Sequence, residues 1–309
     1  MRIIAEHLTY TYNRGSEFAV KALDDVHLTI EEGEFFGIIG HTGSGKSTFI
    51  QHLNALIPLP SASKKYKPPK LKKGETPPPK TVLSVGDFDL TDRHTDFKAL
   101  RAKVGMVFQY PEYQLFAETV AEAVAFGLKN FRPEVKGEAL TLAVREALEA
   151  VGLDYEAVKD QSPFDLSGGQ KRRVAIAGVI VTRPEVLGLD EPAAGLDPLG
   201  KKEIMSLLHR LHKEWCKTVV IVSHDMDEVA ENCSRVAVFS GGKVRFSLPP
   251  SELFTHREEL LSLGLDLPVT AKVVEELRKE GMEINCNFTT DDFIERVTEY
   301  LSKGGGKEC

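Results

Sequence analysis

The stretch Gly40-His41-Thr42-Gly43-Ser44-Gly45-Lys46-Ser47 decides the fold of this chain of 309 residues. It follows a short apolar run, residues 35–39, of the length of a buried strand, and it opens a segment whose apolar residues have helical spacing. Its glycines let backbone N–H groups surround phosphate oxygens, and the N-terminus of the following helix adds partial positive charge. The stretch therefore predicts a phosphate-binding loop in which Lys46 reaches the terminal phosphates and Ser47 offers a hydroxyl to Mg²⁺.

Predicted strands and helices alternate around this loop. Two later apolar runs, residues 186–189 and 219–222, predict buried strands, and a helical stripe at residues 204–211 lies between them. This order predicts an α/β fold with a parallel sheet covered by helices. Directly after the loop, five apolar residues are expected to share one helical face: Phe49, Ile50, Leu53, Leu56 and Ile57.

The composition excludes several classes of protein. With 42% hydrophobic and 28% charged residues, the chain has the composition of a folded globular protein, and its net charge of −7 argues against a nucleic-acid-binding domain. No apolar run reaches the roughly 18 residues that a membrane span requires, and the N-terminus lacks the apolar segment of a secretory signal, so we expect a cytosolic protein. Four scattered cysteines without a CxxC pair favour free thiols over a zinc site.

Residues 58–80 differ from the rest of the chain. They hold seven of the 16 prolines, and seven lysines against one glutamate. Such a segment cannot form a helix interior or bury a core, so it predicts an exposed loop with polyproline character. A docking site for an acidic partner or anionic lipid is one interpretation, but an expanded surface hairpin is favoured because charge blocks are usually solvated.

Two helical regions are expected beyond the loop. Residues 112–180 carry apolar residues at helical spacing and little strand signal, which predicts a helical subdomain. The tail that follows Pro249-Pro250 predicts short amphipathic helices, one of them with Phe293, Ile294, Val297 and Leu301 on one face. We therefore expect one domain over residues 1–245 and a small C-terminal domain over residues 246–309.

A phosphate-binding loop alone occurs in kinases, GTPases and many ATPases, but a second motif narrows the class. The pentapeptide Leu166-Ser167-Gly168-Gly169-Gln170 resembles the signature of ATP-binding cassette (ABC) ATPases, and Asp190-Glu191 follows at the end of a predicted strand. The resemblance implies a P-loop NTPase fold with a RecA-like core, an antiparallel β subdomain, a helical subdomain and a small helical C-terminal domain that serves dimerisation. The cofactors implied are ATP and Mg²⁺.

The same resemblance implies roles for individual residues. Glu191 matches the general base for the attacking water, and His224 matches the histidine that orients the γ-phosphate and that water. Gln109 matches the glutamine that meets Mg²⁺ and senses the transporter partner. The catalytic positions implied are Lys46, Glu191 and His224, and the metal positions are Ser47, Gln109 and Asp190.

Nucleotide contacts are implied at both motifs and at three more distant positions. Tyr12 falls where the family stacks an aromatic ring on adenine, although Tyr10 on the same strand face leaves simple packing open. Asp197 lies in a stretch similar to the family's D-loop. The full set is Tyr12, Gly40, His41, Thr42, Gly43, Ser44, Gly45, Lys46, Ser47, Thr48, Gln109, Ser167, Gly168, Gly169, Gln170 and Asp197.

Finer resemblance points to energy-coupling factor (ECF) transporters. The stretches 108–120 and 167–178 are similar to theirs, with Gly178 where other cassettes commonly carry Arg, and His41-Thr42 resembles the second of their two ATPase paralogues. The resemblance implies a second ATPase subunit, identical or paralogous, whose P-loop site the signature of this chain would complete. It also implies a membrane scaffold contacted near residues 109–116, and substrate-capture membrane subunits for vitamins or metal ions. The chain would then lie peripherally on the cytoplasmic face of the membrane, with no nucleic acid bound.

Other interpretations remain open at this stage. A cassette ATPase that acts on nucleic acid or ribosomes is the main alternative, supported only by the basic segment 58–80. An inactive structural subunit is disfavoured because all catalytic positions are filled. His209 and His212 lie one turn apart on a predicted helix, but two ligands do not make a metal site, so helix packing is the expectation. Gly188 departs from the aliphatic residue that is customary in the Walker B strand.

Overall fold

The computed structural model describes residues 1–63 and 79–302. Most of the proline- and lysine-rich segment predicted to be an exposed loop lies outside the described residues. A six-stranded sheet has the order β10 (Lys243–Leu248), β9 (Arg235–Ser240), β3 (Phe35–Ile39), β8 (Thr218–Val222), β7 (Val186–Asp190) and β6 (Val104–Val107). Only β10 is antiparallel to its neighbour; the other five strands are parallel. The predicted α/β fold and its parallel sheet are confirmed.

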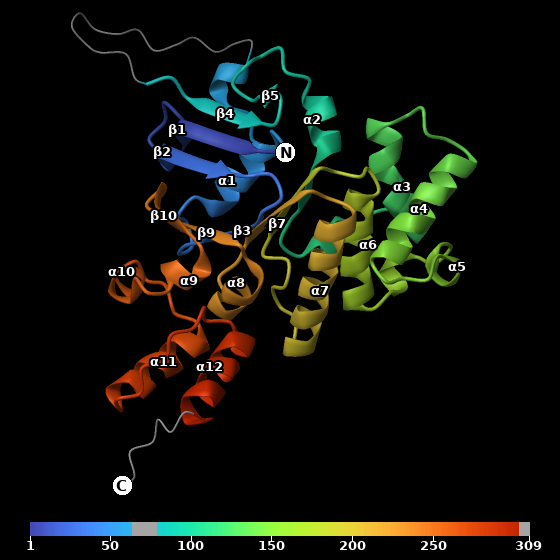
Figure 1. The fold of residues 1–309 in the computed structure, drawn as a ribbon. Helices are drawn as coiled ribbons and strands as arrows, with labels where there is room; N and C mark the ends of the chain where they lie inside the picture. The colour runs from blue at the N-terminus through green and yellow to red at the C-terminus, as the bar shows by residue number, and fades with distance from the viewer. Residues whose placement is uncertain (64–78, 303–309) are drawn as a thin grey trace, which may run out of the picture.

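A second, antiparallel sheet lies on one side of the first (Figure 1). Its order is β2 (Val20–Ile30), β1 (Ile3–Tyr12), β4 (Val82–Val85) and β5 (Phe88–Asp89). Alternate residues of the central strands point into two cores, so that Phe35 packs with the helices on one face while Phe36 packs with α1 (Lys46–Leu53) and the antiparallel sheet. Burial on both faces explains why these strands read as continuous apolar runs.

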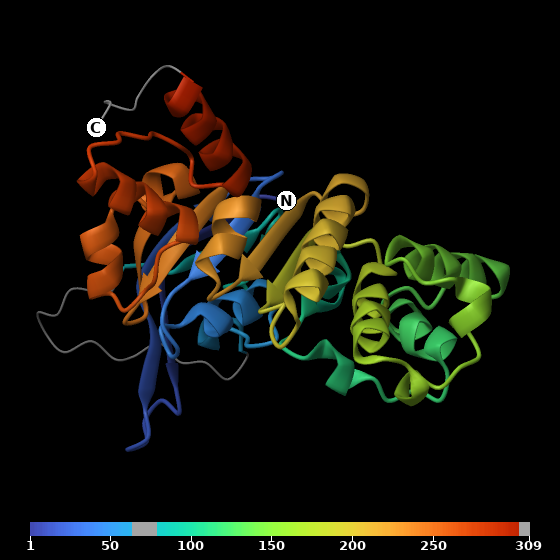
Figure 2. The same cartoon turned by 90° about the horizontal axis from the view of Figure 1, so that it is seen from below.

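The remaining helices cover the sheet or form separate lobes. They are α2 (Phe97–Lys103), α3 (Val120–Phe131), α4 (Glu138–Ala150), α5 (Tyr155–Val158), α6 (Gly168–Ile180), α7 (Pro198–Glu214), α8 (Met226–Asn232), α9 (Pro250–Leu253), α10 (Arg257–Ser262), α11 (Val269–Lys279) and α12 (Thr290–Ser302). Short 3₁₀ helices occur at Pro60–Ala62, Pro111–Gln114 and Pro163–Asp165. Figure 2 shows α3 to α6 as a lobe beside the sheet and the C-terminal helices at the opposite side. Within the described residues, no helix combines the length and apolarity needed to cross a membrane.

The helix that follows the phosphate loop is shorter than the sequence predicts. It ends at Leu53, where Ala55 adopts a left-handed backbone with φ 52°. The Leu56 N–H donates to the carbonyl of Gln51 at 3.0 Å, which closes the helix in the manner of a Schellman motif. The expectation that Leu56 and Ile57 share its apolar face is wrong, because the chain turns before them and leaves Leu56 exposed.

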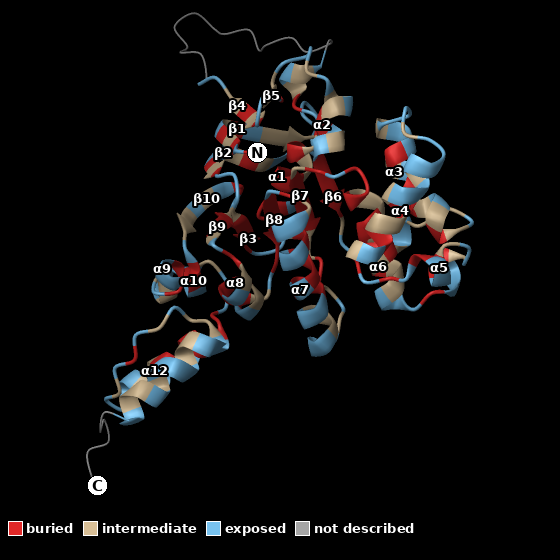
Figure 3. Cartoon of the chain, turned by 45° about the vertical axis from the view of Figure 1, so that its right-hand side comes forward, coloured by how far each residue is buried: buried red, intermediate tan, exposed pale blue. Residues whose placement is uncertain are grey.

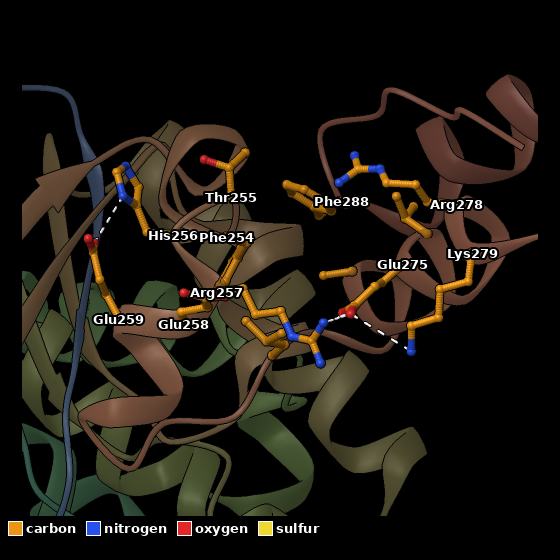
Figure 4. Close-up of a pocket in the computed structure, with 13 residues that line it drawn as sticks. Phe254, Thr255, His256, Arg257, Glu258, Glu259, Glu275, Arg278, Lys279 and Phe288 are labelled. Atoms are coloured by element: carbon orange, nitrogen blue, oxygen red, sulfur yellow. Dashed lines mark hydrogen bonds and ion pairs between the residues drawn. The ribbon is translucent and has the colours of Figure 1, made fainter. Parts of the chain in front are cut away.

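The C-terminal helices join the rest of the chain through both apolar and polar contacts. Leu260, Leu265, Leu267 and Ala271 belong to the same buried cluster as the helices on one face of the central sheet. The backbone N–H of Val269 donates to Asp227 on α8 at 2.7 Å, and within the segment Arg257 forms an ion pair with Glu275 across α10 and α11. A cavity of about 730 Å³ remains between these helices, with Phe254 and Phe288 among its lining residues (Figure 4).

Two glycines allow α3 and α6 to pack closely. A Cβ atom on Gly127 of α3 would lie 2.9 Å from the carbonyl oxygen of Gly178 on α6. The nearest atoms to a Cβ on Gly178 are 3.6 and 3.9 Å away, which is ordinary contact. The close approach of the two helices therefore depends on Gly127, whereas Gly178 has room for a Cβ atom.

Substituting the two glycines is expected to have opposite effects on stability. Gly127→Ala should lower the free energy of unfolding by about 1 kcal/mol. Overpacking destabilises by about 1–3 kcal/mol, and the higher helix propensity of alanine offsets about 1 kcal/mol of that loss. Gly178→Ala should raise it by about 0.5–1 kcal/mol, because it gains propensity without a clash. Urea denaturation measures both variants, and shifts in the same direction would contradict this account of the α3–α6 contact.

Candidate functional site

The parallel sheet brings four chain segments to one edge. Val107, Leu189, Val222 and Ile38 are paired near the ends of their strands, so the residues that follow each strand emerge together. The carboxyl ends of parallel strands are where ligands bind in open α/β sheets. This edge carries the phosphate loop after β3, Gln109 after β6, Glu191 after β7 and His224 after β8.

The phosphate loop has the geometry that phosphate binding requires. Gly43 and Gly45 have φ of 79° and 106°, and a Cβ on Gly45 would lie 2.5 Å from the carbonyl oxygen of Ala22. Gly45 caps α1 without a side-chain hydrogen bond, so the N-terminal N–H groups of this eight-residue helix are not occupied by a side-chain cap. The Ser44 hydroxyl is buried without a hydrogen-bond partner among the described residues. Backbone and side-chain donors therefore suit a polyphosphate.

Lys46 is buried within the loop. Its ammonium group donates to the carbonyl oxygens of Gly40 at 2.6 Å and His41 at 3.0 Å. Burial lowers the pKa of Lys46, and the nearby carboxylates of Glu191 and Asp190 oppose that shift. A charged lysine held by carbonyls at the neck of the loop is a ready partner for phosphate oxygens.

Ser47 and Asp190 provide a set of oxygen donors. Burial is the chief cause of a raised pKa of Asp190, and the neighbouring Ser47 hydroxyl opposes that rise. Hydroxyl and carboxylate oxygens are the ligands that Mg²⁺ prefers. The two residues therefore fit a magnesium ion that also contacts phosphate. Gln109, predicted as a third metal position, donates its amide N–H to the Glu191 carboxylate at 2.9 Å.

Glu191 is the point on which two loops converge. Gln109 Nε2 donates to one carboxylate oxygen at 2.9 Å, and His224 Nδ1 lies 3.3 Å from the other. The backbone of Glu191 has a positive φ of 50°, and its N–H donates to the carbonyl of Val222 at 2.9 Å. The carboxylate is thus fixed at the sheet edge by both main-chain and side-chain contacts, as a base must be.

Several predicted contacts lie near this group and others lie apart from it. The Tyr12 hydroxyl is 3.2 Å from Thr48 Oγ1 on α1, which puts the Tyr12 side chain beside the phosphate-loop helix. Tyr10 packs edge-on against Tyr12 and His52, so the packing role foreseen for it is confirmed. Asp197 caps α7 by accepting from Gly200 N–H at 2.7 Å, and this local role explains its residue type.

The signature pentapeptide begins α6 in the helical lobe. Ser167 and Gln170 form a reciprocal capping box, with bonds of 3.3 and 3.0 Å. Gly168 and Gly169 are exposed, and a Cβ at either position would meet no atom within 4 Å. The helix start is therefore open to an external anion, but it lies on a different lobe from the phosphate loop (Figure 2).

One functional residue was missed by sequence reasoning. Arg172 on α6 is 3% exposed and forms a two-point ion pair with Glu112, at 3.2 and 3.1 Å. The same guanidinium donates to the carbonyls of Pro192 and Ala194, directly after Glu191. The sequence signals only a basic run after the signature, and burial of one of its charges depends on tertiary packing. His209 Nε2 lies 2.8 Å from Asn232 Oδ1, and His212 Nε2 lies 3.0 Å from the carbonyl oxygen of Lys217.

Comparisons with known proteins agree with this geometry. The family described as ABC transporter matches residues 23–194. The energy-coupling factor transporter ATP-binding protein EcfA2 of Clostridioides difficile is 46% identical over 99% of this chain and 99% of its own length. EcfA2 of Symbiobacterium thermophilum is 48% identical over 94% of this chain and 93% of its own. The solved structure of cbiO1 from Clostridium perfringens, part of the ABC transporter complex cbiONQ, has a TM-score of 0.67 at 35% identity and covers 88% of this chain and 98% of that chain.

The chain therefore belongs to the ABC transporter family of ATPases. Within that family, its full-length relatives named above are ATP-binding proteins of energy-coupling factor transporters, and both carry the designation of the second paralogue. The predicted family and subgroup are confirmed. The alternative of a cassette that acts on nucleic acid or ribosomes finds no support in these relatives, which are transport proteins.

The Arg172 ion pair gives a stability prediction. Arg172→Met should lower the free energy of unfolding by about 3 kcal/mol, because it leaves the largely buried Glu112 without its countercharge. Lys103→Met is the control, since its exposed ion pair with Glu185 should contribute less than about 1 kcal/mol. Urea denaturation measures both losses. An equal loss in the two variants would show that the Arg172 contact has no special weight.

Proposed function

We propose that this chain is the ATP-binding and ATP-hydrolysing subunit of an energy-coupling factor transporter, which powers uptake of vitamins or metal ions through membrane partner subunits. The observation that carries the proposal is the convergence of Gln109 and His224 on the Glu191 carboxylate, beside the oxygen donors of Ser47 and Asp190. A site built in this way suits in-line attack of water on the γ-phosphate of ATP.

Each residue of the site has a defined task in that reaction. Glu191 accepts a proton from the attacking water. The water oxygen bonds to the γ-phosphorus while the bond between that phosphorus and the β–γ bridging oxygen breaks, and ADP leaves with the bridging oxygen. Lys46 opposes the charge that develops on the phosphate oxygens, and His224 keeps the Glu191 carboxylate oriented. Mg²⁺, held by Ser47 and Asp190 when bound, supplies charge neutralisation at the phosphates. The Tyr12 ring and Thr48 would contact the nucleotide at the start of α1.

A second ATPase subunit completes the site in this proposal. The start of α6 at Ser167, Gly168 and Gly169 faces outward from the helical lobe, so it would close over nucleotide held by a partner's phosphate loop. Gln170 and Asp197 would shape the same junction through their caps. The partner is a paralogue or a second copy of this chain.

The C-terminal domain, residues 246–309, would hold the two ATPases together. Helix α12 has no buried residue, and Figure 3 shows its surface as exposed or intermediate. Ile294 and Leu301 are 56% and 63% exposed, and Val269 and Val273 on α11 are exposed as well. Apolar side chains at helical spacing on an uncovered face suit a second such domain.

A membrane scaffold would dock on the side chains around the 3₁₀ helix Pro111–Gln114. We call Tyr110, Tyr113, Phe116 and Phe126 the aromatic turn. Tyr113 is 84% exposed and Phe116 67%, and the rings of Phe116 and Phe126 pack edge-on at 4.9 Å. A cluster of exposed aromatic rings is typical of a protein contact surface. Gln109 directly precedes Tyr110, so its hydrogen bond to Glu191 connects the aromatic turn to the proposed base. With the scaffold docked on this turn, the chain would lie peripherally on the cytoplasmic face of the membrane.

The base assignment is tested by Glu191→Gln. The amide retains the shape of the side chain but cannot accept a proton, so kcat for ATP hydrolysis should fall by about 10²–10⁴ while ATP binding persists. Glu149→Gln, a change of the same type on the exposed face of α4, should leave turnover unchanged. Steady-state phosphate release and nucleotide binding measure the two effects. Undiminished turnover in Glu191→Gln would refute the base assignment.

The transport assignment is tested by co-purification from detergent extracts of cells that produce the chain. An integral membrane protein and a second ATPase should be recovered with it. Tyr113→Ala and Phe116→Ala should reduce recovery of the membrane protein, because they remove apolar area from the aromatic turn. Phe18→Ala, an exposed aromatic on the β1–β2 connection, should not. Recovery of ribosomes or nucleic acid without a membrane protein would overturn the transporter proposal.

A further inference from the structure

The β1–β2 pair shifts register at three places, and two consecutive shifts, on either side of the Leu8–Val26 pair, insert extra residues first into β1 and then into β2. The buried residues Ala5 and Leu8 are three positions apart instead of two, and the pairing with β2 shifts register at this point and again after it. Each strand has a non-glycine residue with positive φ at its bulge, His7 at 50° and Asp25 at 56°. Such backbone costs on the order of 1–3 kcal/mol and concentrates at functional sites. Bulges also re-aim side chains.

The bulges bring three metal-ligating side chains together on the outer face of this sheet. His7 Nδ1 lies 2.8 Å from Asp25 Oδ1, and His27 Nε2 lies 3.3 Å from the same oxygen. One ligand atom from each residue lies within 4.8 Å of the other two. Across residues 1–63 and 79–302, no other trio of His, Cys, Asp or Glu side chains comes this close. The cluster is separate from the phosphate loop and has no part in hydrolysis.

We propose that His7, Asp25 and His27 form a binding site for a divalent transition metal ion of the Zn²⁺ type. Two imidazole nitrogens and one carboxylate oxygen are a ligand set that Zn²⁺ accepts, with a fourth position left to water. In a tetrahedral site with bonds of about 2.0–2.1 Å, ligand atoms lie about 3.3 Å apart. The His27–Asp25 separation of 3.3 Å matches this spacing, whereas the His7–Asp25 separation of 2.8 Å would have to widen slightly on binding. Mg²⁺ prefers oxygen ligands, so the ion of the nucleotide site would not compete.

The backbone around the cluster is held in place by neighbouring side chains. Thr81 Oγ1 donates to the carbonyl oxygen of His7 at 3.0 Å, and the N–H of Asp25 donates to Thr9 Oγ1 at 3.0 Å. These four residues line one cavity of about 870 Å³, and His27 lies outside its lining. The His27 and Asp25 side chains are each about half exposed, so an ion and its fourth ligand would have access from solvent. A site with a fixed backbone loses little freedom on binding.

A metal ion at this position would cross-link β1 and β2. These strands share one antiparallel ladder (Figure 1), and β1 ends at Tyr12, whose hydroxyl lies 3.2 Å from Thr48 Oγ1 on the phosphate-loop helix. An ion that binds the folded chain and not the unfolded chain stabilises the fold by mass action. The site does not depend on the proposed transport function, and its test requires neither ATP nor membrane partners.

The test is a titration of the full chain with Co²⁺, which reports its ligands by visible absorption, in excess Mg²⁺. The wild type should bind one ion with tetrahedral d–d absorption that Zn²⁺ abolishes. His27→Gln and His7→Gln should weaken binding by at least about tenfold, the lower end of what even outer hydrogen-bond partners cost. His94→Gln is the matched control, because His94 also pairs with an aspartate, at 3.0 Å, but has no third ligand nearby.

A second measurement guards against loss of folding. His27 is exposed, so without metal the Tm of His27→Gln should equal that of the wild type. Added Zn²⁺ should raise the Tm of the wild type and of His94→Gln, but not that of His27→Gln. Equal Co²⁺ affinity in wild type, His27→Gln and His94→Gln would overturn the proposal. A thiolate-to-cobalt charge-transfer band would also overturn it, because that band assigns the ion to cysteine.

Discussion

The register of the parallel strands is the constraint on which the rest of the structure depends. Phe35 pairs with Val219 and Val186 pairs with Thr218, which aligns the carboxyl ends of β3, β7 and β8. Hydrogen bonds across the sheet then fix where the phosphate loop, Glu191 and His224 emerge. A slip of one residue would exchange the two cores and also separate these side chains, because successive strand residues point to opposite faces. Fold stability and site geometry therefore have one common origin.

The sequence predicts well whatever depends on local pattern. The phosphate loop and the three strands at residues 35–39, 186–190 and 218–222 are each encoded by adjacent residues, and each lies where the sequence indicates. The other three strands of the central sheet were not predicted. Gln109 and His224 were predicted as site residues from the resemblance to ABC ATPases alone, because no local pattern connects either residue to Glu191. Their meeting depends on the order of three strands in the sheet, and composition or periodicity does not report that order.

Features that depend on distant packing escaped prediction. The end of α1 is set by Ala55 in a left-handed conformation, which sequence rules assign to glycine, so nothing in the pattern indicated it. The buried charge of Arg172 is balanced by Glu112, sixty positions away in the chain. The cluster of His7, Asp25 and His27 arises from bulges in β1 and β2 and not from residue spacing. In each case the decisive partner lies on another element.

The four hydrogen bonds of Arg172 have a mechanical consequence. They fasten the signature helix to the turn that carries Glu112 and Tyr113, and to the carbonyls that follow Glu191. These three segments are therefore tied to one another by a single guanidinium group. Displacing any one of them would break or strain hydrogen bonds to the other two, so a shift of the turn at Tyr113 would bear on the residues that follow Glu191.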